Sequence, residues 1–356
     1  MADRRSYINA VGTAVPDHDV HRAFIAWAEG QIAGERERAL FRRMAERSAI
    51  DHRWSVLPPA ERGGSPVERG GFYHGAPPGT AQRMEVYARE APKLALRAIG
   101  DLSERATIAG ITHLVVASCT GFTAPGIDQI LAEALGMPHV ERTMVGFMGC
   151  YAAVSALRVA DHIVRAEPEA RVLAVTVELS SLHLQQEREV EPLLAMLQFS
   201  DGAAAALVGA DPQGFAIRGS FALTLEDSAG LITWTIGDTG FAMRLSGGVP
   251  ARIGAALQDE AVRARMLDGW SMREVDAWAV HAGGRSILDA VEKGLGLDRD
   301  ALAASRDVLA RYGNMSSSTL MFVLARLMRE PEQKRGVALA FGPGLAAEGF
   351  RFERAP

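Results

Sequence analysis

Hydrophobic and polar positions along the chain fall into blocks that predict strands and helices in turn. Continuous apolar runs bounded by turn residues predict buried strands over 7–15, 111–118, 171–177, 215–223, 233–245, 277–281 and 337–341. Apolar residues at helical spacing predict a helix after residue 150 and others within 20–55 and over 81–102, 127–135, 251–267, 286–295 and 316–329. Residues 198–208 lead into a further strand, and the Pro- and Gly-rich segment 56–80 predicts an irregular loop. This alternation favours an α/β sheet that helices cover on both faces.

A link near residues 210–214 interrupts the alternation, after which strands and helices begin again. We therefore expect an N-terminal half over 1–212 and a C-terminal half over 213–356. Each half places a reactive side chain at a strand-to-helix turn, and this similarity favours a duplicated architecture.

The composition is that of an ordinary enzyme with a full core. The 356 residues are 48% hydrophobic and 23% charged, with a net charge of −5, so no basic field predicts binding to nucleic acid or to an anionic membrane. The two cysteines exclude a disulfide framework, and the N-terminal segment lacks the apolar core of a signal peptide. Because no run of about 18 apolar residues occurs, we expect no membrane span. These features predict a soluble, cytoplasmic protein.

The segment Thr143–Arg158, TMVGFMGCYAAVSALR, places a thiol at a strand-to-helix turn. Cys150 stands where a helical apolar pattern begins. A thiol in the first turn of a buried helix faces free backbone N–H groups and the positive end of the helix dipole, which favours the thiolate. Gly149 lacks a side chain where an acyl group would approach the sulfur. The alternative is a packed cysteine, because free Cys is among the most buried residue types.

Two polar residues of the second half stand where apolar strands end. His281 closes the run AWAVH before a Gly-Gly turn, and Asn314 lies in YGNM just before SSST. A cysteine with distant histidine and asparagine partners is an arrangement used for acyl transfer. Taken alone, His281 would be interpreted as a core or turn histidine, and Asn314 as a capping or turn residue. The catalytic hypothesis therefore rests on Cys150, His281 and Asn314 together.

Seven segments in a fixed order surround these residues. They are RMEVYAREAPKLA at 83–95, CTGFTAPGIDQ at 119–129, MGCYAA around Cys150, FSDGAAA at 199–205, VHAGGRSILD at 280–289, YGNMSSS at 312–318 and FGPGLAAE at 341–348. Together they span nearly the whole chain, and the pattern resembles the bacterial type III polyketide synthases, the chalcone synthase-like family of the thiolase superfamily. YGNMSSS followed by FGPG is specific to this family within the superfamily.

The resemblance implies a five-layered αβαβα, thiolase-like fold of two similar halves, and a homodimer. It implies that Cys150 carries a starter acyl group as a thioester. His281 and Asn314 would donate hydrogen bonds to the thioester carbonyl of malonyl-CoA, stabilising first an enolate and then a tetrahedral oxyanion. His281 would also pair with the Cys150 thiolate and keep it ionised at neutral pH. CoA thioesters are the expected substrates, with no metal or redox cofactor.

Further residues receive roles only through the resemblance. Arg43 and Arg47 fall where the family places basic residues that bind CoA phosphates, and a third such position is Leu40 here. Phe199 matches the gatekeeper phenylalanine between the CoA tunnel and the chamber. The resemblance also implies a substrate cavity lined by Met243, Trp234, Cys119, Ser180, His183, Ser316, Phe341, Gly342 and Pro343.

Two of these residues bear on the substrate. Met243 stands in place of a second gatekeeper phenylalanine, and its narrow, flexible side chain favours a linear aliphatic starter. Trp234 stands in place of a cavity glycine, and its bulk favours few extensions. A pyrone or a resorcinol fits such a cavity, and an aromatic starter is the alternative.

The predicted activity is iterative decarboxylative condensation of malonyl-CoA onto an acyl-CoA starter held on Cys150, followed by cyclisation. One alternative is a ketoacyl synthase III-like enzyme that condenses once with malonyl on an acyl carrier protein, and FGPG after YGNMSSS argues against it. A second is a catalytically silent acyl-CoA-binding protein, which the presence of all three candidate catalytic residues disfavours. A third is a cysteine hydrolase, which gains nothing from a malonyl-decarboxylating pair.

Overall fold

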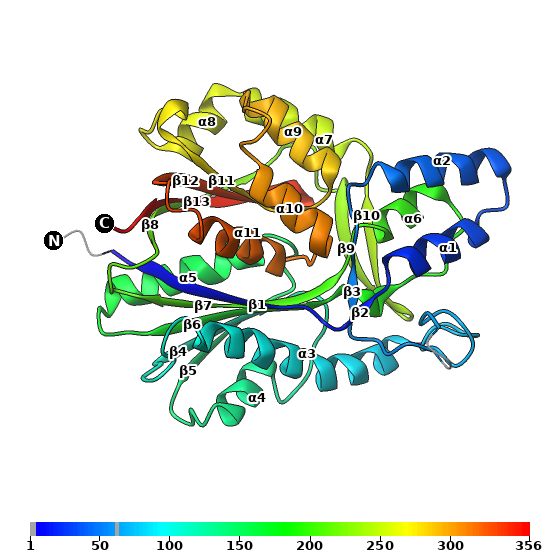
Figure 1. The fold of residues 1–356 in the computed structure, drawn as a ribbon, viewed down its shortest axis with the longest axis horizontal. Helices are drawn as coiled ribbons and strands as arrows, with labels where there is room; N and C mark the ends of the chain where they lie inside the picture. The colour runs from blue at the N-terminus through cyan, green and yellow to red at the C-terminus, as the bar shows by residue number, and fades with distance from the viewer. Residues whose placement is uncertain (1–4, 61–63) are drawn as a thin grey trace.

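The computed structural model describes residues 5–60 and 64–356, which form alternating layers of helices and strands (Figure 1). Residues 61–63 of the predicted loop over 56–80 lie outside the described residues. From one face to the other the layers are helix, sheet, helix, sheet and helix, so the predicted αβαβα arrangement is confirmed. Among the described residues no helix is long and apolar enough to cross a bilayer.

Two half-sheets form the second and fourth layers. The first contains, in hydrogen-bonded order, β1 (Tyr7–Ala14), β7 (Asp201–Gly209), β6 (Val172–Leu179), β4 (His113–Ser118) and β5 (Glu141–Gly146). The second contains β8 (Phe215–Thr224), β13 (Ala346–Arg354), β12 (Arg335–Gly342) and β11 (Ala277–Val280). β1 pairs with β8 only at Tyr7 and Ile8, so the strand order bends there and the two half-sheets stack on each other.

Two helices fill the layer between the half-sheets, namely α5 (Ala152–Ala166) and α11 (Ser318–Met328). α5 contacts β4, β6 and β13, whereas α11 contacts β1, β7, β11 and β12. Inward-facing residues of both half-sheets join these helices in one apolar core. A helix between two sheets is apolar on nearly all sides, which explains the run STLMFVLARLM in α11.

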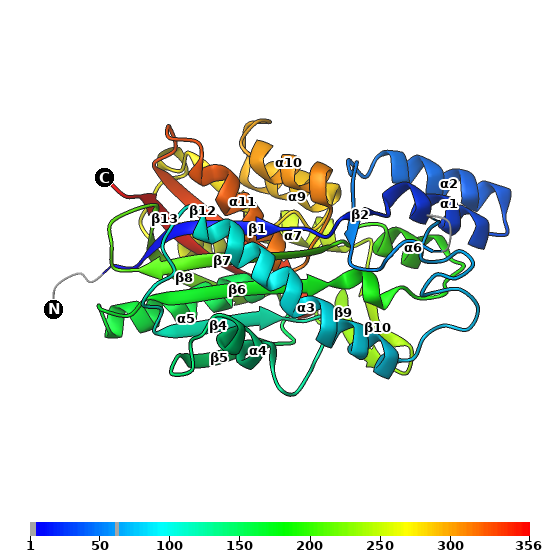
Figure 2. The ribbon, with the colours of Figure 1, turned by 60° about the horizontal axis from the view of Figure 1, so that its bottom comes forward.

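Outer helices cover the remaining sheet faces. α3 (Thr80–Ser103) and α4 (Ile127–Ala134) lie on the first half-sheet, and Figure 2 shows α3 running across it. α7 (Val249–Gln258), α8 (Glu260–Leu267) and α9 (Arg285–Leu295) lie on the second. α3 approaches β1 so closely that a Cβ on Gly12 would lie 2.2 Å from the Leu102 nitrogen. A side chain at position 12 would therefore push the helix from the sheet.

The remaining elements form a lobe at one end of the layers (Figure 1). α1 (His21–Gln31), α2 (Glu35–Glu46) and α6 (Val190–Met196) share a small core around Phe41 and Leu193. Two short two-stranded sheets adjoin this lobe, β2 (His18–Asp19) with β3 (Trp54–Ser55) and β9 (Ile232–Gly237) with β10 (Gly240–Leu245). α10 (Ala303–Tyr312) leads from α9 to Asn314.

The differences from the predicted elements have local causes. Residues 233–245 form the β9–β10 hairpin instead of one strand, because the chain turns at Asp238 and Thr239. The helix expected over 251–267 is interrupted at Asp259, whose side chain accepts from the first N–H groups of α8 and caps it. Residues 47–55 leave the helical pattern expected within 20–55. α6, α10 and β13 had no predicted counterpart.

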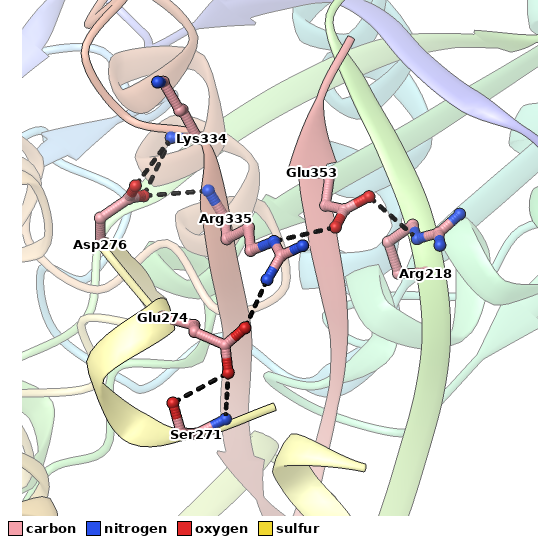
Figure 3. Close-up of polar contacts among 7 residues, drawn as sticks. All are labelled: Arg218, Ser271, Glu274, Asp276, Lys334, Arg335 and Glu353. Atoms are coloured by element: carbon pink, nitrogen blue, oxygen red, sulfur yellow. Dashed lines mark hydrogen bonds and ion pairs between the residues drawn. The ribbon is translucent and has the colours of Figure 1, made fainter. Parts of the chain in front are cut away.

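An ion-pair network braces the second half-sheet (Figure 3). Arg335 on β12 contacts Glu274 at 2.7 Å and Glu353 on β13 at 3.1 Å. Glu353 continues to Arg218 on β8 at 3.1 Å, and Asp276 accepts from the backbone N–H groups at the start of β12. These side chains are partly exposed, so each pair contributes at most about 1 kcal/mol. Because Arg335 and Glu353 are cross-strand partners, the network favours the observed register of β12 and β13.

Candidate active site

Cys150 lies between β5 and α5, at the junction that the sequence predicts. The helix begins at Ala152 with Tyr151 as its N-cap, so the thiol precedes the first turn instead of lying in it. Gly149 has a φ of +82°, and a Cβ there would lie 2.3 Å from Cδ of Pro343. A glycine at this position therefore lets the FGPG turn pack against the loop that carries the thiol.

The FGPG turn also packs against the Cys150 loop through Gly342. A Cβ on Gly342 would lie 3.3 Å from the backbone nitrogen of Cys150. Phe341 is buried in the core of the second half. Phe341, Gly342 and Pro343 were expected to line the substrate cavity, but none of them lines the three cavities described below. The FGPG turn instead supports the loop that carries the thiol.

Asn314 connects the two halves beside the thiol. Its backbone N–H donates to the Gln198 carbonyl and its own carbonyl accepts from the Ser200 N–H, both at 2.8 Å. Its side-chain oxygen accepts from the Ser316 N–H at 2.9 Å, which leaves the amide Nδ2 to act as a donor. This donor reaches the Gly283 carbonyl at 3.1 Å and also acts on the Cys150 thiol, whose pKa it lowers. Asn314 and Cys150 therefore lie close together, as the catalytic hypothesis requires.

His281 follows β11 and lies next to the same glycine. Its N–H donates to the Leu339 carbonyl at 2.8 Å, which holds the residue at the end of the strand. A Cβ on Gly283 would lie 3.3 Å from Cδ2 and Nε2 of the imidazole, so a glycine there leaves the ring room. The carbonyl of Gly283 also accepts from the Asn314 amide, so the turn that follows His281 holds the Asn314 side chain in place.

Ser316 links the two cysteines. Its Oγ lies 3.2 Å from the Cys119 sulfur and donates to the Cys150 sulfur at 3.7 Å. The residue has a φ of +47°, an unfavourable backbone conformation for a non-glycine residue that is common at functional sites. Both thiols are free, as expected for a chain without a disulfide framework. Among the described residues no group of three or more His, Cys, Asp or Glu is arranged to hold a metal.

A buried carboxylate that the sequence analysis missed lies behind these thiols. Glu178 on β6 is fully buried and accepts from the Cys119 N–H at 3.0 Å and from the Thr120 hydroxyl at 2.8 Å. Cys119 Sγ and the Ser317 hydroxyl donate to its other oxygen. Burial raises the pKa of Glu178, while these donors lower it. The signal was available, because an acidic residue inside an apolar strand is rarely buried without a partner.

Burial decides the protonation states of the catalytic candidates. Loss of water raises the pKa of the Cys150 thiol to about 12, although the Ser316 and Asn314 donors lower it. Burial lowers the pKa of His281 to about 3, and both of its ring nitrogens lack a hydrogen-bond partner among the described residues. Burial therefore favours a neutral thiol and a neutral imidazole in the free enzyme, and the ion pair of thiolate and imidazolium stays a prediction.

A small inner pocket of about 10 Å³ lies at the thiol, with room for roughly one water. Its lining contains Cys150 and six of the residues expected at the cavity: Cys119, Ser180, Phe199, Trp234, Met243 and Ser316. Trp234 and Met243 are direct partners across the β9–β10 hairpin. Trp234 Nε1 donates to the Cys119 carbonyl at 2.8 Å, which fixes the indole beside the thiol.

A larger chamber of about 120 Å³ adjoins the inner pocket. The two share Ser180, Phe199, Trp234 and Met243, and we refer to these four residues as the passage. The chamber extends from the passage to α1 and the loop after β3. Much of its lining is apolar: Val20, Phe24, Leu57, Pro66, Val67, Leu184, Pro192, Met196 and Ala242.

His183 lines the chamber as expected, but its contacts give it a positioning role. Its Nε2 donates to the Thr120 carbonyl at 2.7 Å, and its Nδ1 accepts from the Phe241 N–H at 3.0 Å. The ring stacks on Phe241 at a centroid distance of 4.2 Å. Burial lowers the pKa of His183 to about 3, so the ring is neutral and holds β10 against the first half.

A third cavity of about 860 Å³ opens to solvent between α2, α6 and the start of α9, and we refer to it as the mouth. Arg47 and Leu40 line it, whereas Arg43 lines a neighbouring hollow that shares Leu40. Arg285 also lines the mouth, and its Nη1 donates to the Arg47 carbonyl at 3.2 Å. Arg285 belongs to the motif VHAGGRSILD, but no role for it was predicted from the sequence.

The comparison with known families agrees with this geometry. The family model described as chalcone and stilbene synthases, N-terminal domain, matches residues 1–212, and the corresponding C-terminal domain matches residues 218–355. The chain belongs to the chalcone and stilbene synthase family. It is therefore a type III polyketide synthase and an acyltransferase, as its motifs predicted.

Similar proteins are known from distant organisms. The synthase is 31% identical to the alpha-pyrone synthesis polyketide synthase-like Pks18 of Mycobacterium tuberculosis, over 97% of this chain and 90% of that protein. It resembles PKS-I of the brown alga Ectocarpus siliculosus with a TM-score of 0.87 at 29% identity, covering 98% of both chains. The C-terminal type III polyketide synthase domain of Steely1 from Dictyostelium gives a TM-score of 0.89 at 26% identity, over 99% of this chain and 100% of that domain.

A first prediction concerns the thiol of the synthase. Ser316→Ala removes a donor to the Cys150 sulfur, so the thiol pKa rises further and the thiolate fraction falls at every pH below that value. We expect iodoacetamide to alkylate Cys150 about threefold more slowly at pH 8. Peptide mass spectrometry measures the rate separately for Cys150 and Cys119.

The matched control is Ser317→Ala, which removes a donor to Glu178 instead. This change raises the pKa of Glu178 and reduces the negative charge near the thiol, so alkylation of Cys150 should not slow. Equal slowing in both variants would contradict a direct role for Ser316 at the sulfur.

Proposed function

We propose that this synthase extends a linear aliphatic acyl-CoA starter a few times with malonyl-CoA and releases a pyrone, with a resorcinol as the second candidate. The observation that supports this most directly is the passage between the thiol and the chamber. Met243 is flexible and lets a thin chain through when it moves, whereas Trp234 is fixed by its hydrogen bond and keeps the passage narrow. The similarity to an enzyme named for α-pyrone synthesis supports closure by lactone formation.

The first half-reaction loads the starter on Cys150. The thiol begins neutral, so its proton moves to His281 while the sulfur attacks the acyl-CoA carbonyl. The imidazolium then gives this proton to the departing CoA sulfur, which leaves the acyl group as a thioester on Cys150. Burial keeps the His281 ring neutral between steps, so that a free ring nitrogen can accept the proton of Cys150 in the next one.

The second half-reaction uses malonyl-CoA in the same place. The bond between the malonyl carboxylate and the α-carbon breaks, CO₂ leaves, and the electron pair remains as an enolate of the thioester. Asn314 Nδ2 and a ring N–H of His281 donate to the enolate oxygen. The imidazole has no other hydrogen-bond partner among the described residues, and Ser316 N–H fixes the orientation of the Asn314 amide. The enolate carbon then attacks the carbonyl of the Cys150 thioester, and the bond to the Cys150 sulfur breaks so that the sulfur leaves as a thiolate. The chain, longer by two carbons, is now a CoA thioester and is transferred back to Cys150 before the next extension.

Product analysis tests this function. Purified protein with malonyl-CoA and acyl-CoA starters of increasing length should give pyrones without any acyl carrier protein. We propose that no metal or redox cofactor takes part, so a chelator should leave the yield unchanged. Cys150→Ala should give no product. Mass spectrometry should find acyl groups on Cys150 of the wild-type enzyme and none at this position in the variant.

Three outcomes would contradict this proposal. Product that forms only with malonyl on a carrier protein would indicate a single-condensation enzyme. Binding of acyl-CoA without release of CoA or CO₂ would indicate a silent binding protein. Release of free acid without carbon–carbon bond formation would indicate a hydrolase.

We further propose that Arg47 and Arg285 bind the phosphates of CoA at the mouth. Both side chains are exposed and line one cavity. Arg47 is the C-cap of α2, and Arg285 is the first residue of α9, whose N-cap Gly284 carries no side-chain cap. Free N–H groups at the start of a helix attract phosphate, and arginine binds it through two parallel hydrogen bonds. Arg43 lines the neighbouring hollow beyond Leu40, so it would contact only the part of CoA that lies outside the mouth.

Arg285→Ala tests this assignment. We expect the KM for malonyl-CoA to rise about fivefold with kcat unchanged, because an exposed charge pair contributes roughly 1 kcal/mol. The KM for malonyl-pantetheine, which lacks the nucleotide phosphates, should not change. The matched control is Arg311→Ala on α10, an exposed arginine paired with Asp307 that lines none of the cavities described here. An equal rise with both thioesters would contradict phosphate binding.

We also propose that the synthase is a homodimer that pairs through β5. This strand ends the sheet order and is mostly exposed, and an exposed edge strand is a template for pairing. Two large apolar side chains on the same region are exposed, Met144 at 44% and Phe122 at 49%. Phe122 stacks with Phe147, so the patch is ordered within one chain. A second copy would cover both.

Sedimentation measures this association. The wild type should sediment with twice the chain mass of 38.1 kDa. Met144→Lys places a charge in the proposed interface and should shift the equilibrium to monomer by at least about tenfold. Ile236→Lys, at another exposed apolar residue, is the matched control and should leave the dimer intact. A monomeric wild type would contradict the proposal.

A further inference from the structure

The chamber contains a buried cation for which the condensation chemistry has no use. Arg53 lies just before β3, is 4% exposed and lines the chamber but not the inner pocket. Its Nε donates to His21 Nδ1 at 3.1 Å, and its Cζ lies 4.5 Å over the Phe24 ring. Its Nη1 donates to the carbonyls of Met196 at 3.1 Å and Phe199 at 2.8 Å. The remaining nitrogen, Nη2, is buried and has no hydrogen-bond partner among the described residues.

No carboxylate of the described residues forms an ion pair with this guanidinium. Asp19 and Asp201 act on it only through their charge, because their oxygens have other partners. Asp201 accepts from Ser181 N–H at 2.7 Å and from Val56 N–H at 2.9 Å. Burial lowers the pKa of Arg53 to about 10, so the group stays charged at pH 7. A buried charge with a free N–H is costly, and an acceptor oxygen in the chamber would offset this cost.

We propose that Arg53 binds an oxygen of the acyl chain in the chamber, so that the preferred chain is linear and carries a hydrogen-bond acceptor away from the thioester. The acceptor is either the terminal carboxylate of a dicarboxylic starter or a keto oxygen of the growing chain. This inference rests on the proposed function, because an acyl group on Cys150 reaches the chamber through the passage. Guanidinium groups bind such oxygens through short, charge-assisted hydrogen bonds.

The same guanidinium holds one wall of the passage. Its Nη1 bonds to the carbonyl of Phe199, whose backbone in turn pairs with Asn314. An oxygen bound at Nη2 therefore orders the group that positions the gatekeeper and the catalytic amide. Chain binding in the chamber and geometry at the thiol are coupled through Arg53.

A second buried arginine provides a matched control. Arg83 is fully buried, and it donates through Nε to the Pro78 carbonyl and through Nη1 to the carbonyls of Leu182 and Leu184. Its Cζ lies 5.2 Å over the Tyr73 ring, and its Nη2 also lacks a partner among the described residues. Arg83 does not line the chamber. Substitution of Arg83 therefore removes a buried arginine that supports the chamber wall through Tyr73 and Leu184 but presents no group of its own to the chamber.

The experiment compares two series of starters of equal length on the intact synthase, methyl-terminated acyl-CoAs and ω-carboxyacyl-CoAs. We expect the wild type to accept at least one ω-carboxyacyl-CoA within tenfold of its methyl-terminated counterpart in kcat/KM, because an apolar chamber would exclude a carboxylate far more strongly. Arg53→Gln should lower this ratio about tenfold, and Arg53→Lys, which keeps the charge, should recover part of it. Arg83→Gln should leave the ratio unchanged.

The distribution of products distinguishes the two sources of oxygen. If the keto oxygen is bound, Arg53→Gln changes the proportion of triketide to tetraketide from methyl-terminated starters while Arg83→Gln does not, and the starter ratio stays constant. Equal behaviour of the two variants in both assays would overturn the proposal. Thermal unfolding checks whether Arg53→Gln folds. If it does not, the wild type and Arg53→Lys carry the test. The proposal is then overturned when the wild type rejects every ω-carboxyacyl-CoA and Arg53→Lys gives the same products as the wild type. Pyrone formation from methyl-terminated starters checks the proposed function separately.

Discussion

The site depends on a short backbone pairing between the two halves of the chain. Asn314 exchanges hydrogen bonds with the segment Gln198–Ser200, and this contact places an amide from the second half beside a thiol from the first. The FGPG turn adds a second bridge, since Pro343 packs against the glycine before Cys150. Neither half alone has both the nucleophile and its hydrogen-bond donors. The duplicated fold is therefore a requirement of the chemistry, because the two half-sheets must stack before the reactive groups meet.

Desolvation is the dominant electrostatic effect throughout this region. It raises the pKa of Cys150 and Glu178 and lowers that of His281, His183 and Arg53. Donors from Ser316 and Asn314 oppose this effect at the thiol but do not reverse it. A neutral thiol has a practical consequence, since it reacts slowly with any electrophile that does not enter the site. Reactivity then develops only when an acyl-CoA carbonyl arrives and the proton moves to His281.

The strands, the central helices and Cys150, His281 and Asn314 could be predicted from the sequence because each depends on a local pattern. Apolar runs bounded by turn residues predicted β4, β6, β11 and β12, and short motifs identified the three catalytic candidates. The prediction of a thiolate from the helix dipole left the effect of burial out, because the dipole is a local property whereas burial depends on the whole fold. Glu178 and Arg53 were missed for the same reason. The sequence around a charged residue inside or beside an apolar strand does not show which donors, carbonyls or cavities will surround that residue in the fold.

The three cavities offer environments that suit different parts of an acyl-CoA. The mouth is exposed and carries arginines, which suits phosphates, and the inner pocket is lined by the thiol and by Ser316 as a donor, which suits the thioester. The chamber is mostly apolar but contains the charged guanidinium of Arg53, so it suits a hydrocarbon chain with an oxygen in one place. A cavity built for hydrocarbon alone would gain nothing from a guanidinium in its wall, because an apolar side chain of similar volume would remove the cost of desolvation. The position of that charge, and not the volume of the chamber, is the feature that would select among linear acyl chains.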